Sequence, residues 1–445
     1  MAGQDAARKA MLLLGEWAAR LRWEDVPPRV RDRLSLVLLD TLGVCLAGAR
    51  EPEQQRLVEA WRPAAGPAPL LGAGRTAAVE ASAWLNATAL VRLELDEGNK
   101  YAKGHPAAHA FPAVIALAAD LRAPGPETMT ALLAAYEVAS RFGRATRLRA
   151  GAHPHGSWGV AGAAAGCARL LGLGPRQVAA AIDAGSGMPI AGHFASALDG
   201  NPVRDAWMGA ANVSGLAAAR MAQAGTARTT GTAAHSLGEL LGDFDPDAAA
   251  ADLGERWDVE LGYFKRHASC SFTHPAADAV LALPEEIAPD EVDEVLVETH
   301  ALAAGLTRTR WDSRLGALFS IPFVVAAALV HGHVRPGASS GAALHDPRVA
   351  ALAARVAVRE APDLTARLPD ERVTRVTVRR ARGDVTVEVP NPVGDSAHHP
   401  LDRGALQDLL TDLLGADTAA ELVRCSAAIA TAPDVSTPLR RLADL

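Results

Sequence analysis

Residues 159–173 read GVAGAAAGCARLLGL, and this run of small apolar side chains decides the fold class. Residues 209–225, GAANVSGLAAARMAQAG, have the same texture. Glycine and alanine let neighbouring helices approach closely, and a helix that is apolar on all sides belongs inside a bundle rather than on its surface. The two stretches therefore predict helices at the centre of a helical bundle.

Helical spacing of apolar residues extends from these stretches over most of the first 262 residues. One expected helix opens at Pro27 and Pro28 and stops near Gly48, with proline and glycine in their usual positions at the two ends of a helix. Hydrophobic residues make up 49% of the chain but aromatic ones only 4%, which favours close-packed helices over a β-sandwich. The sequence predicts a mainly α protein.

The texture changes after about residue 265. Alternating apolar and polar residues, typical of strands, occupy residues 292–299, 373–379 and 385–389, and the Gly-Asp pair at 383–384 predicts a hairpin between the last two. Helical periods fall between the strands at 315–331 and 346–358, and helical periodicity returns from residue 401. We predict a helical domain over residues 1–264, a smaller α+β domain over 265–398, and helices over 399–445 that return to the first domain.

Charge and cysteine content exclude several classes of function. The net charge is −7, so there is no overall positive field to attract nucleic acid or an anionic membrane. An anionic small substrate would have to be held by a few local cations. Cys45, Cys167, Cys270 and Cys425 are far apart, without the close pairs typical of zinc sites or iron–sulfur clusters. The spacing favours reduced thiols in a cytoplasmic protein.

No segment predicts export or membrane insertion. Asp5 and Glu16 interrupt the apolar residues of the first twenty positions, which argues against a signal peptide. The apolar run at 315–330 is short for a membrane span and contains Pro322, so a buried helix is the better interpretation. We expect a cytoplasmic protein without a membrane partner.

Three generic motifs are better explained as structure than as sites. Residues 337–341 (GASSG) match a nucleophile elbow, but Arg-Pro precedes them where that motif needs a strand. His105 and His109 are spaced like zinc ligands on a helix, but the glutamate of that motif is missing and Pro106 follows the first histidine, so we expect a loop. The alternate aspartates of 243–247 lack the glycine and glutamate of a calcium loop and predict a solvated loop.

Four polar segments interrupt the apolar pattern and are candidates for a site. Buried charges are unfavourable unless they are paired or used, so polar clusters beside apolar helices invite a functional interpretation. Taken singly, each could be an ordinary surface loop. The last one lies at the predicted domain boundary, where small-molecule sites often occur. The segments are 94–106 (ELDEGNKYAKGHP), 151–159 (GAHPHGSWG), 201–205 (NPVRD) and 263–275 (YFKRHASCSFTHP).

The chain resembles the MmgE/PrpD family. Residues 39–44 (LDTLGV), the His105-Pro106 and His153-Pro154 loops, the segment from Lys265 onward and residues 318–323 (LFSIPF) are similar to family signatures and follow the family order along most of the chain. The resemblance implies a large helical domain contributed by both chain ends, a smaller α+β lid domain, a homodimer and no cofactor. Family activities include 2-methylcitrate dehydratase, cis-aconitate decarboxylase and iminodisuccinate epimerase.

The resemblance also implies a set of site residues. Residues 94–99 (ELDEGN) depart from the family pattern Asp-Phe-Asp-Asp-Thr and have one extra residue, which leaves the choice of substrate open. Arg204 stands where relatives often have a lysine. The implied catalytic residues are His105, His153 and Asp96, the implied substrate-binding residues are Lys265, Arg204, Asn99, Lys103 and His274, and no metal ligand is implied.

All three family reactions pass through a carbanion or enolate beside a carboxylate. Such a reaction needs donors that hold the carboxylate and a group that titrates near neutrality. His105 suits the proton transfer, His153 could protonate a departing hydroxyl, and Lys265 and Arg204 suit carboxylate binding. We predict a cofactor-independent hydro-lyase for a 2-methylcitrate-like acid. Decarboxylation, epimerisation and a non-catalytic helical binding or scaffold protein are the alternatives.

Overall fold

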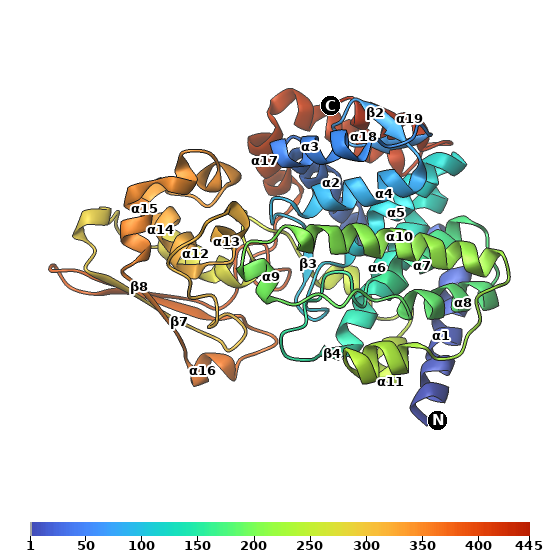
Figure 1. The fold of residues 1–445 in the computed structure, drawn as a ribbon, viewed down its shortest axis with the longest axis horizontal. Helices are drawn as coiled ribbons and strands as arrows, with labels where there is room; N and C mark the ends of the chain where they lie inside the picture. Colours follow the sequence, from blue (N-terminus) through green and yellow to red (C-terminus); the bar gives the residue numbers. More distant parts are fainter. Residues whose placement is uncertain (1) are drawn as a thin grey trace.

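The structure, a computed structural model, describes residues 2–445 and consists of a large helical part and a smaller α+β part (Figure 1). The mainly α fold predicted from the sequence is confirmed. In the larger part the helices are α1 (Ala2–Arg20), α2 (Pro28–Ala49), α3 (Pro52–Trp61), α4 (Val79–Val91), α5 (Pro106–Leu121), α6 (Gly125–Ala145), α7 (Val160–Leu170), α8 (Pro175–Ser186), α9 (Ala195–Leu198), α10 (Val203–Gln223), α11 (Pro246–Ala250), α17 (Arg403–Leu414), α18 (Ala416–Ile429) and α19 (Ser436–Ala443). Its short strands are β1 (Ala68–Leu70), β2 (Arg75–Ala77), β3 (Gly98–Asn99), β4 (Thr146–Leu148), β5 (Gly242–Phe244) and β6 (Gly262–Tyr263).

Helix α7 lies at the centre of the larger part, as its small side chains predict. Every residue from Val160 to Ala168 is buried. A Cβ atom at Gly162 would lie 2.5 Å from the carbonyl oxygen of Ala135 in α6, so only glycine permits this approach. Helix α10, which contains the second small-residue stretch, is instead half-exposed along one side, and Met221 is 41% exposed. The prediction of a central position was wrong for α10, which has neighbours on one side only.

The C-terminal helices pack against the N-terminal ones, and Figure 1 shows α17 and α18 beside α2 and α3. Leu406, Leu410 and Leu422 belong to the same hydrophobic core as the buried face of α2. Gly43 in α2 makes room for them, because a Cβ there would lie 2.4 Å from Leu410 Cδ2. This shared core supports the predicted return of residues 399–445; the domain boundaries themselves stay predictions.

The smaller part is a four-stranded sheet with helices over one face, apart from the short helix at residues 362–365, which lies away from the others (Figure 1). The strand order is β10-β9-β7-β8, with β7 and β8 parallel and the other pairs antiparallel. Val295, Val297, Val376 and Val378 point into a separate hydrophobic core beneath the helices. The strands are β7 (Glu294–Thr299), β8 (Val356–Glu360), β9 (Thr374–Arg379) and β10 (Val385–Val389), and the helices are α12 (His274–Leu281), α13 (Arg314–Leu318), α14 (Ile321–His331), α15 (Pro347–Ala353) and α16 (Pro362–Thr365).

Two helices predicted in this part differ from the structure. The expected helix at 315–331 is split into α13 and α14, because the Ser320 hydroxyl accepts a hydrogen bond from the Phe323 backbone N–H (3.0 Å) and caps a new helix. The expected helix at 346–358 ends at Ala353, and the residues that follow form β8. Pairing with β7, about sixty positions earlier in the chain, overrides the local helical pattern.

Candidate active site

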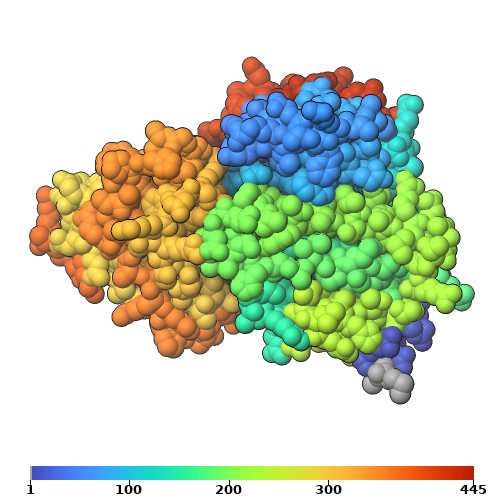
Figure 2. Space-filling view, in the orientation of Figure 1, coloured from blue at the N-terminus to red at the C-terminus, as the bar shows by residue number. Residues whose placement is uncertain are grey.

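A small cavity lies where the two parts of the molecule meet, at the junction visible in Figure 2. Its volume is about 50 Å³. The larger part contributes Glu94, Lys103, His105, His153 and His155 to its lining. From the linking segment and the smaller part come Tyr263, Cys270, Ser271, Phe272, Phe319 and Arg372. Three of the four polar segments predicted from the sequence thus meet at one cavity.

The topology brings the first and last of these segments together. Strand β3 pairs with β6, with Gly98 opposite Tyr263 and Asn99 opposite Gly262. Gly98 is required there, because a Cβ atom would lie 2.4 Å from the hydroxyl oxygen of Tyr263. This short ladder places the acidic residues before β3 beside Lys265, which follows β6.

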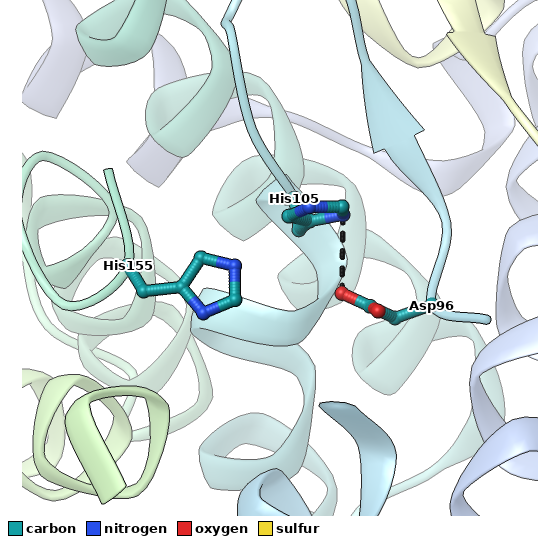
Figure 3. Close-up of side chains that lie close together, drawn as sticks. All are labelled: Asp96, His105 and His155. Atoms are coloured by element: carbon teal, nitrogen blue, oxygen red, sulfur yellow. Dashed lines mark ion pairs between the residues drawn. The ribbon is translucent and has the colours of Figure 1, made fainter. Parts of the chain in front are cut away.

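His105 occupies the position just before α5, with Pro106 as the first residue of the helix. The predicted loop holds for His105, which precedes the helix, but was wrong for His109, which lies in α5. A proline without an N–H is well suited to the first turn of a helix. The His105 Nδ1–H donates to the backbone carbonyl of Glu97 (2.7 Å). Oδ2 of Asp96 lies 3.0 Å from the same nitrogen, outside hydrogen-bond geometry (Figure 3). Burial lowers the pKa of His105 below its ordinary value, and Asp96 partly offsets this, so the ring is neutral at neutral pH.

His153 and His155 approach the cavity from the loop before α7. His153 Nδ1 accepts a hydrogen bond from the His155 backbone N–H (3.0 Å), and its ring stacks on Phe194 with centroids 5.2 Å apart. The His155 ring lies edge-on to both His105 and His153, at centroid distances of 5.2 Å and 4.5 Å. Burial and then the charge of Arg204 hold the pKa of both loop histidines well below the ordinary range. All three rings are therefore neutral.

His109 holds this arrangement in place without lining the cavity. Its Nδ1–H donates to the carbonyl of His105 (2.8 Å), and its Nε2 accepts from the Gly156 backbone N–H (3.0 Å). The ring also packs on Trp158 at 4.5 Å. Because both nitrogens are used by the backbone, His109 acts as a structural link between α5 and the loop that carries His153 and His155.

Side chains of alternating positive and negative charge form a row of ion pairs behind the cavity, and the last carboxylate of the row lies beside His105. Arg92 and Arg204 each lie 3.1 Å from Asp205, and Arg204 also pairs with Glu94. Lys265 Nζ lies 3.3 Å from Glu94 and 3.4 Å from Asp96. Burial alone would raise the pKa of Asp96, but His105, Lys265 and Arg204 lower it below its ordinary value. Two buried cations, Arg204 and Lys265, and the partly buried Arg92 therefore balance three buried carboxylates.

Two further buried acidic side chains, Glu97 and Asp40, are not paired with cations in this way. The Tyr136 hydroxyl donates to Glu97 Oε1 (2.6 Å), and the Ala107 N–H donates to Oε2 (3.2 Å). Burial raises the pKa of Glu97 to about 8. Burial and the neighbouring Glu97 and Asp96 carboxyls raise the pKa of Asp40, in α2, well above its ordinary value. Asp40 and Glu97 are thus carboxylic acids rather than carboxylates at neutral pH.

We expect Glu97→Gln to reduce the pH dependence of stability. The folded-state pKa of about 8 exceeds the ordinary value of 4.5, so the folded protein binds the extra proton and loses stability as the pH rises between those values. Glutamine cannot ionise, so the variant should lose several degrees less in Tm than wild type between about pH 5 and about pH 8. Glu53→Gln, at an exposed position, is the control. Equal Tm losses in Glu97→Gln and wild type would show that Glu97 has an ordinary pKa.

Asp96, His105 and His155 are also a geometric candidate for a metal site. Across residues 2–445 they form the only such group of three, with ligand atoms within 4.8 Å of one another. Two fixed cations already face these atoms, since Lys265 Nζ lies 3.4 Å from Asp96 and Arg204 Nη2 lies 3.1 Å from His155 Nδ1. A divalent ion would be placed against both charges, so the donor set fits a metal poorly.

The residues predicted for the site fall into three groups. His105, His153 and Lys103 line the cavity. Asp96, Arg204 and Lys265 lie directly behind the cavity wall, among the alternating charges described above. There the carboxylate of Glu94 pairs with both Arg204 and Lys265. Asn99 and His274 do not line it. The Asn99 side chain bonds the backbone of Tyr101, Ala102 and Asp258, and His274 Nε2 bonds the carbonyl of Ser269 (3.1 Å).

Three contributors were missed by the sequence analysis. His155 and Glu94 stand in two of the segments that were singled out, so the signal was present but was assigned to their neighbours. Arg372 lies in an ordinary-looking stretch before β9, and nothing in its local sequence marks it. Only the packing of the two parts brings it to the cavity.

The other two motifs have structural roles. The residues of the GASSG run begin in a 3-10 turn, and the Ser339 hydroxyl donates to the Pro336 carbonyl (3.2 Å), so the nucleophile elbow is absent there. The expected solvated loop at 243–247 was wrong in part. Asp243 lies in β5, and the Asp245 side chain accepts from two backbone N–H groups to cap α11.

Comparison with known proteins finds similar sequences among fungal proteins. A cis-aconitate decarboxylase of Aspergillus terreus is 27% identical over 286 residues, 59% of this chain and 58% of that protein. The chain therefore spans less than two thirds of that relative. A cis-aconitate decarboxylase-like protein of Aspergillus oryzae is 26% identical over 72% of this chain and 73% of its own length. None of the helices within residues 2–445 has the length and apolar character needed to cross a membrane.

Two family domains cover most of the chain. Residues 13–237 match the MmgE/PrpD N-terminal domain, and residues 267–428 match the MmgE/PrpD C-terminal domain. The junction between the two matches, at residues 238–266, contains β6 and Lys265 and so falls at the cavity. The chain belongs to the MmgE/PrpD family.

Proposed function

We propose that the protein is a cofactor-independent lyase that transfers a proton beside a carboxylate of a small di- or tricarboxylic acid. The observation that carries this proposal is the pairing of two neutral histidines with opposite tautomers at one buried cavity. A proton acceptor and a proton donor that face the same space are what an elimination of water requires. The preferred reaction is dehydration of a 2-methylcitrate-like acid.

His105 is the base in this proposal. Its Nδ1 carries the proton that it donates to the Glu97 carbonyl, so Nε2 keeps its lone pair. As the base takes a proton from the carbon next to the carboxylate, the ring becomes positively charged. The Asp96 carboxylate, 3.0 Å from Nδ1, would stabilise that charge in the transition state.

His153 is the donor. Its Nδ1 accepts from the His155 N–H, so in the neutral ring the proton lies on Nε2. That N–H can hydrogen-bond the hydroxyl oxygen as it departs. His155 packs between the two rings and receives a hydrogen bond from Arg204, which would keep both in orientation.

Decarboxylation is the second candidate, because both fungal relatives carry that activity in their names. In that reaction His105, once protonated, would deliver a proton to the carbon that carbon dioxide leaves. The same cavity and the same ring would serve, with His153 limited to binding. The homodimer and the cytoplasmic location remain predictions.

The test is a product and exchange assay with the purified wild-type chain. Citrate-like hydroxy acids, cis-aconitate and simple dicarboxylates are incubated in deuterated water and followed by NMR. We expect loss of water from the hydroxy acid, with deuterium entering the recovered hydroxy acid at the carbon beside a carboxylate through the reverse reaction. Release of carbon dioxide instead would establish the second candidate. Exchange with inversion and no loss of mass would identify an epimerase. Binding without any exchange would contradict the proposal and favour a scaffold.

A further inference from the structure

Arg372 is a buried cation without an acidic partner. It is 6% exposed, and in the part of the chain that the structure describes no carboxylate lies within ion-pair distance of its guanidinium. Nη1 lies 3.4 Å from the Ser271 hydroxyl, and Nη2 lies 3.4 Å from the carbonyl of Lys100. Both contacts are long and neutral. A buried charge held so weakly is unfavourable unless an anion joins it.

The other buried cations near the cavity are already neutralised. Arg204 pairs with Glu94 and Asp205, and Lys265 pairs with Glu94 and Asp96. Lys100 pairs with Asp395 at 3.1 Å. These carboxylates would have to be displaced before a substrate anion could bind the cations. Arg372 needs no such exchange.

The surroundings of Arg372 suit a bound anion. The guanidinium lies 5.6 Å from the ring centre of Tyr263 and 5.2 Å from that of Phe272, so two aromatic rings border it. Arg372 lines the small cavity together with the histidines. It also lines an adjoining cavity of about 600 Å³, and Lys103 likewise lines both cavities. The two cations therefore stand at the passage between the cavities.

The small cavity alone has room for only a few water-sized groups. An acid with more than one carboxylate, bound with its reacting carbon at His105, must extend past this passage. Lys103 has no acidic partner either among residues 2–445, and its Nζ donates only to the Thr146 carbonyl (3.3 Å).

We propose that Arg372 and Lys103 form an anion-binding subsite for the second carboxylate of the substrate, remote from the carbon that exchanges its proton. The inference rests on the proposed function for the identity of the ligand as a polycarboxylic acid. The subsite selects di- and tricarboxylates over monocarboxylates. Arg372 contributes a planar fork of donors that matches a carboxylate, and Lys103 adds a second charge at the mouth.

A purely structural role for Arg372 is the alternative. Its bond to the Lys100 carbonyl joins the smaller part to the larger one, so the side chain could serve only as a clasp. Loss of a clasp lowers Tm but has no preference for the number of carboxylates on a ligand. The two roles therefore differ in what they predict for binding.

The experiment is calorimetric titration with propane-1,2,3-tricarboxylate, which has neither a hydroxyl nor a double bond to react, and with butyrate. We expect Arg372→Gln to weaken tricarboxylate binding about 10- to 100-fold, the usual size of one charged hydrogen bond, and to leave butyrate binding unchanged. Arg372→Lys should recover part of the loss, and Lys103→Met should show a smaller one. Arg375→Gln is the matched control, since Arg375 lies three positions away on β9 and pairs with surface carboxylates.

Tricarboxylate affinity in Arg372→Gln within twofold of wild type, with both proteins folded by Tm, would overturn the inference, and so would a wild-type chain that does not bind the tricarboxylate. Because the ligand is inert, this measurement is independent of turnover. Exchange activity in wild type combined with unchanged affinity in Arg372→Gln would remove the subsite and keep the proposed function. If Arg372→Gln loses affinity for the tricarboxylate but wild type shows no exchange, the subsite stands and the proposed function is removed.

Discussion

His105→Ala should lower kcat by about 10²- to 10⁴-fold, the range usual for removal of a general acid–base group. The ring is the one whose Nδ1–H is held by the Glu97 carbonyl and whose charged form Asp96 can stabilise. Alanine removes the proton acceptor and leaves Asp96 paired with Lys265. The measurement is the rate of deuterium incorporation at saturating acid, together with the melting temperature.

His345→Ala is the matched control, because His345 is exposed in the smaller part and lies outside the cavity. It should keep the wild-type rate and Tm. Full exchange activity in His105→Ala would end the assignment of His105 as base. A lost rate accompanied by a collapsed Tm would instead point to the bond between His105 and Glu97 as a folding contact.

Lys265→Met should lower the stability of the protein more than a substitution at any other residue in the row of ion pairs behind the cavity. Lys265 is fully buried and is the partner of both Glu94 and Asp96, so methionine leaves the buried Asp96 without its lysine and leaves Glu94 with Arg204 as its remaining cation. Removal of one partner of a buried ion pair costs about 3–5 kcal/mol. For 445 residues this corresponds to a fall in Tm of about 3–6 °C, which thermal unfolding can measure.

The double variant Glu94→Gln, Lys265→Met tests the reason for this loss. It removes one charge of each sign, so Arg92 and Arg204 again balance Asp96 and Asp205. We expect it to recover part of the Tm lost in Lys265→Met. A double variant that is as unstable as the sum of its two single changes would show that packing of the lysine side chain, rather than charge balance, is what matters.

The fold could be predicted from the sequence wherever a local pattern and the tertiary packing agree. Helix α7 has small apolar residues on all sides and is buried on all sides, and β7, β9 and β10 alternate as their neighbours in the sheet require. Strand β8 could not be predicted in this way. Its residues follow a helical run, and the hydrogen bonds that make them a strand come from β7. Ser320 was a missed signal, since serine two residues before Pro322 is a favourable start for a helix.

The candidate site, too, was predictable from the sequence only in part. The sequence alone marked the polar segments around His105, His153 and Lys265, because charged residues among apolar helices stand out in a one-dimensional pattern. Tertiary structure alone decided which of their charges are available: Glu94 and Asp96 neutralise Lys265 across more than 160 positions, whereas Arg372 reaches the cavity without a partner. The physical reason is that the charge state and ligand capacity of a buried group depend on what lies within a few ångströms of it, and those neighbours are brought there by the packing of distant segments.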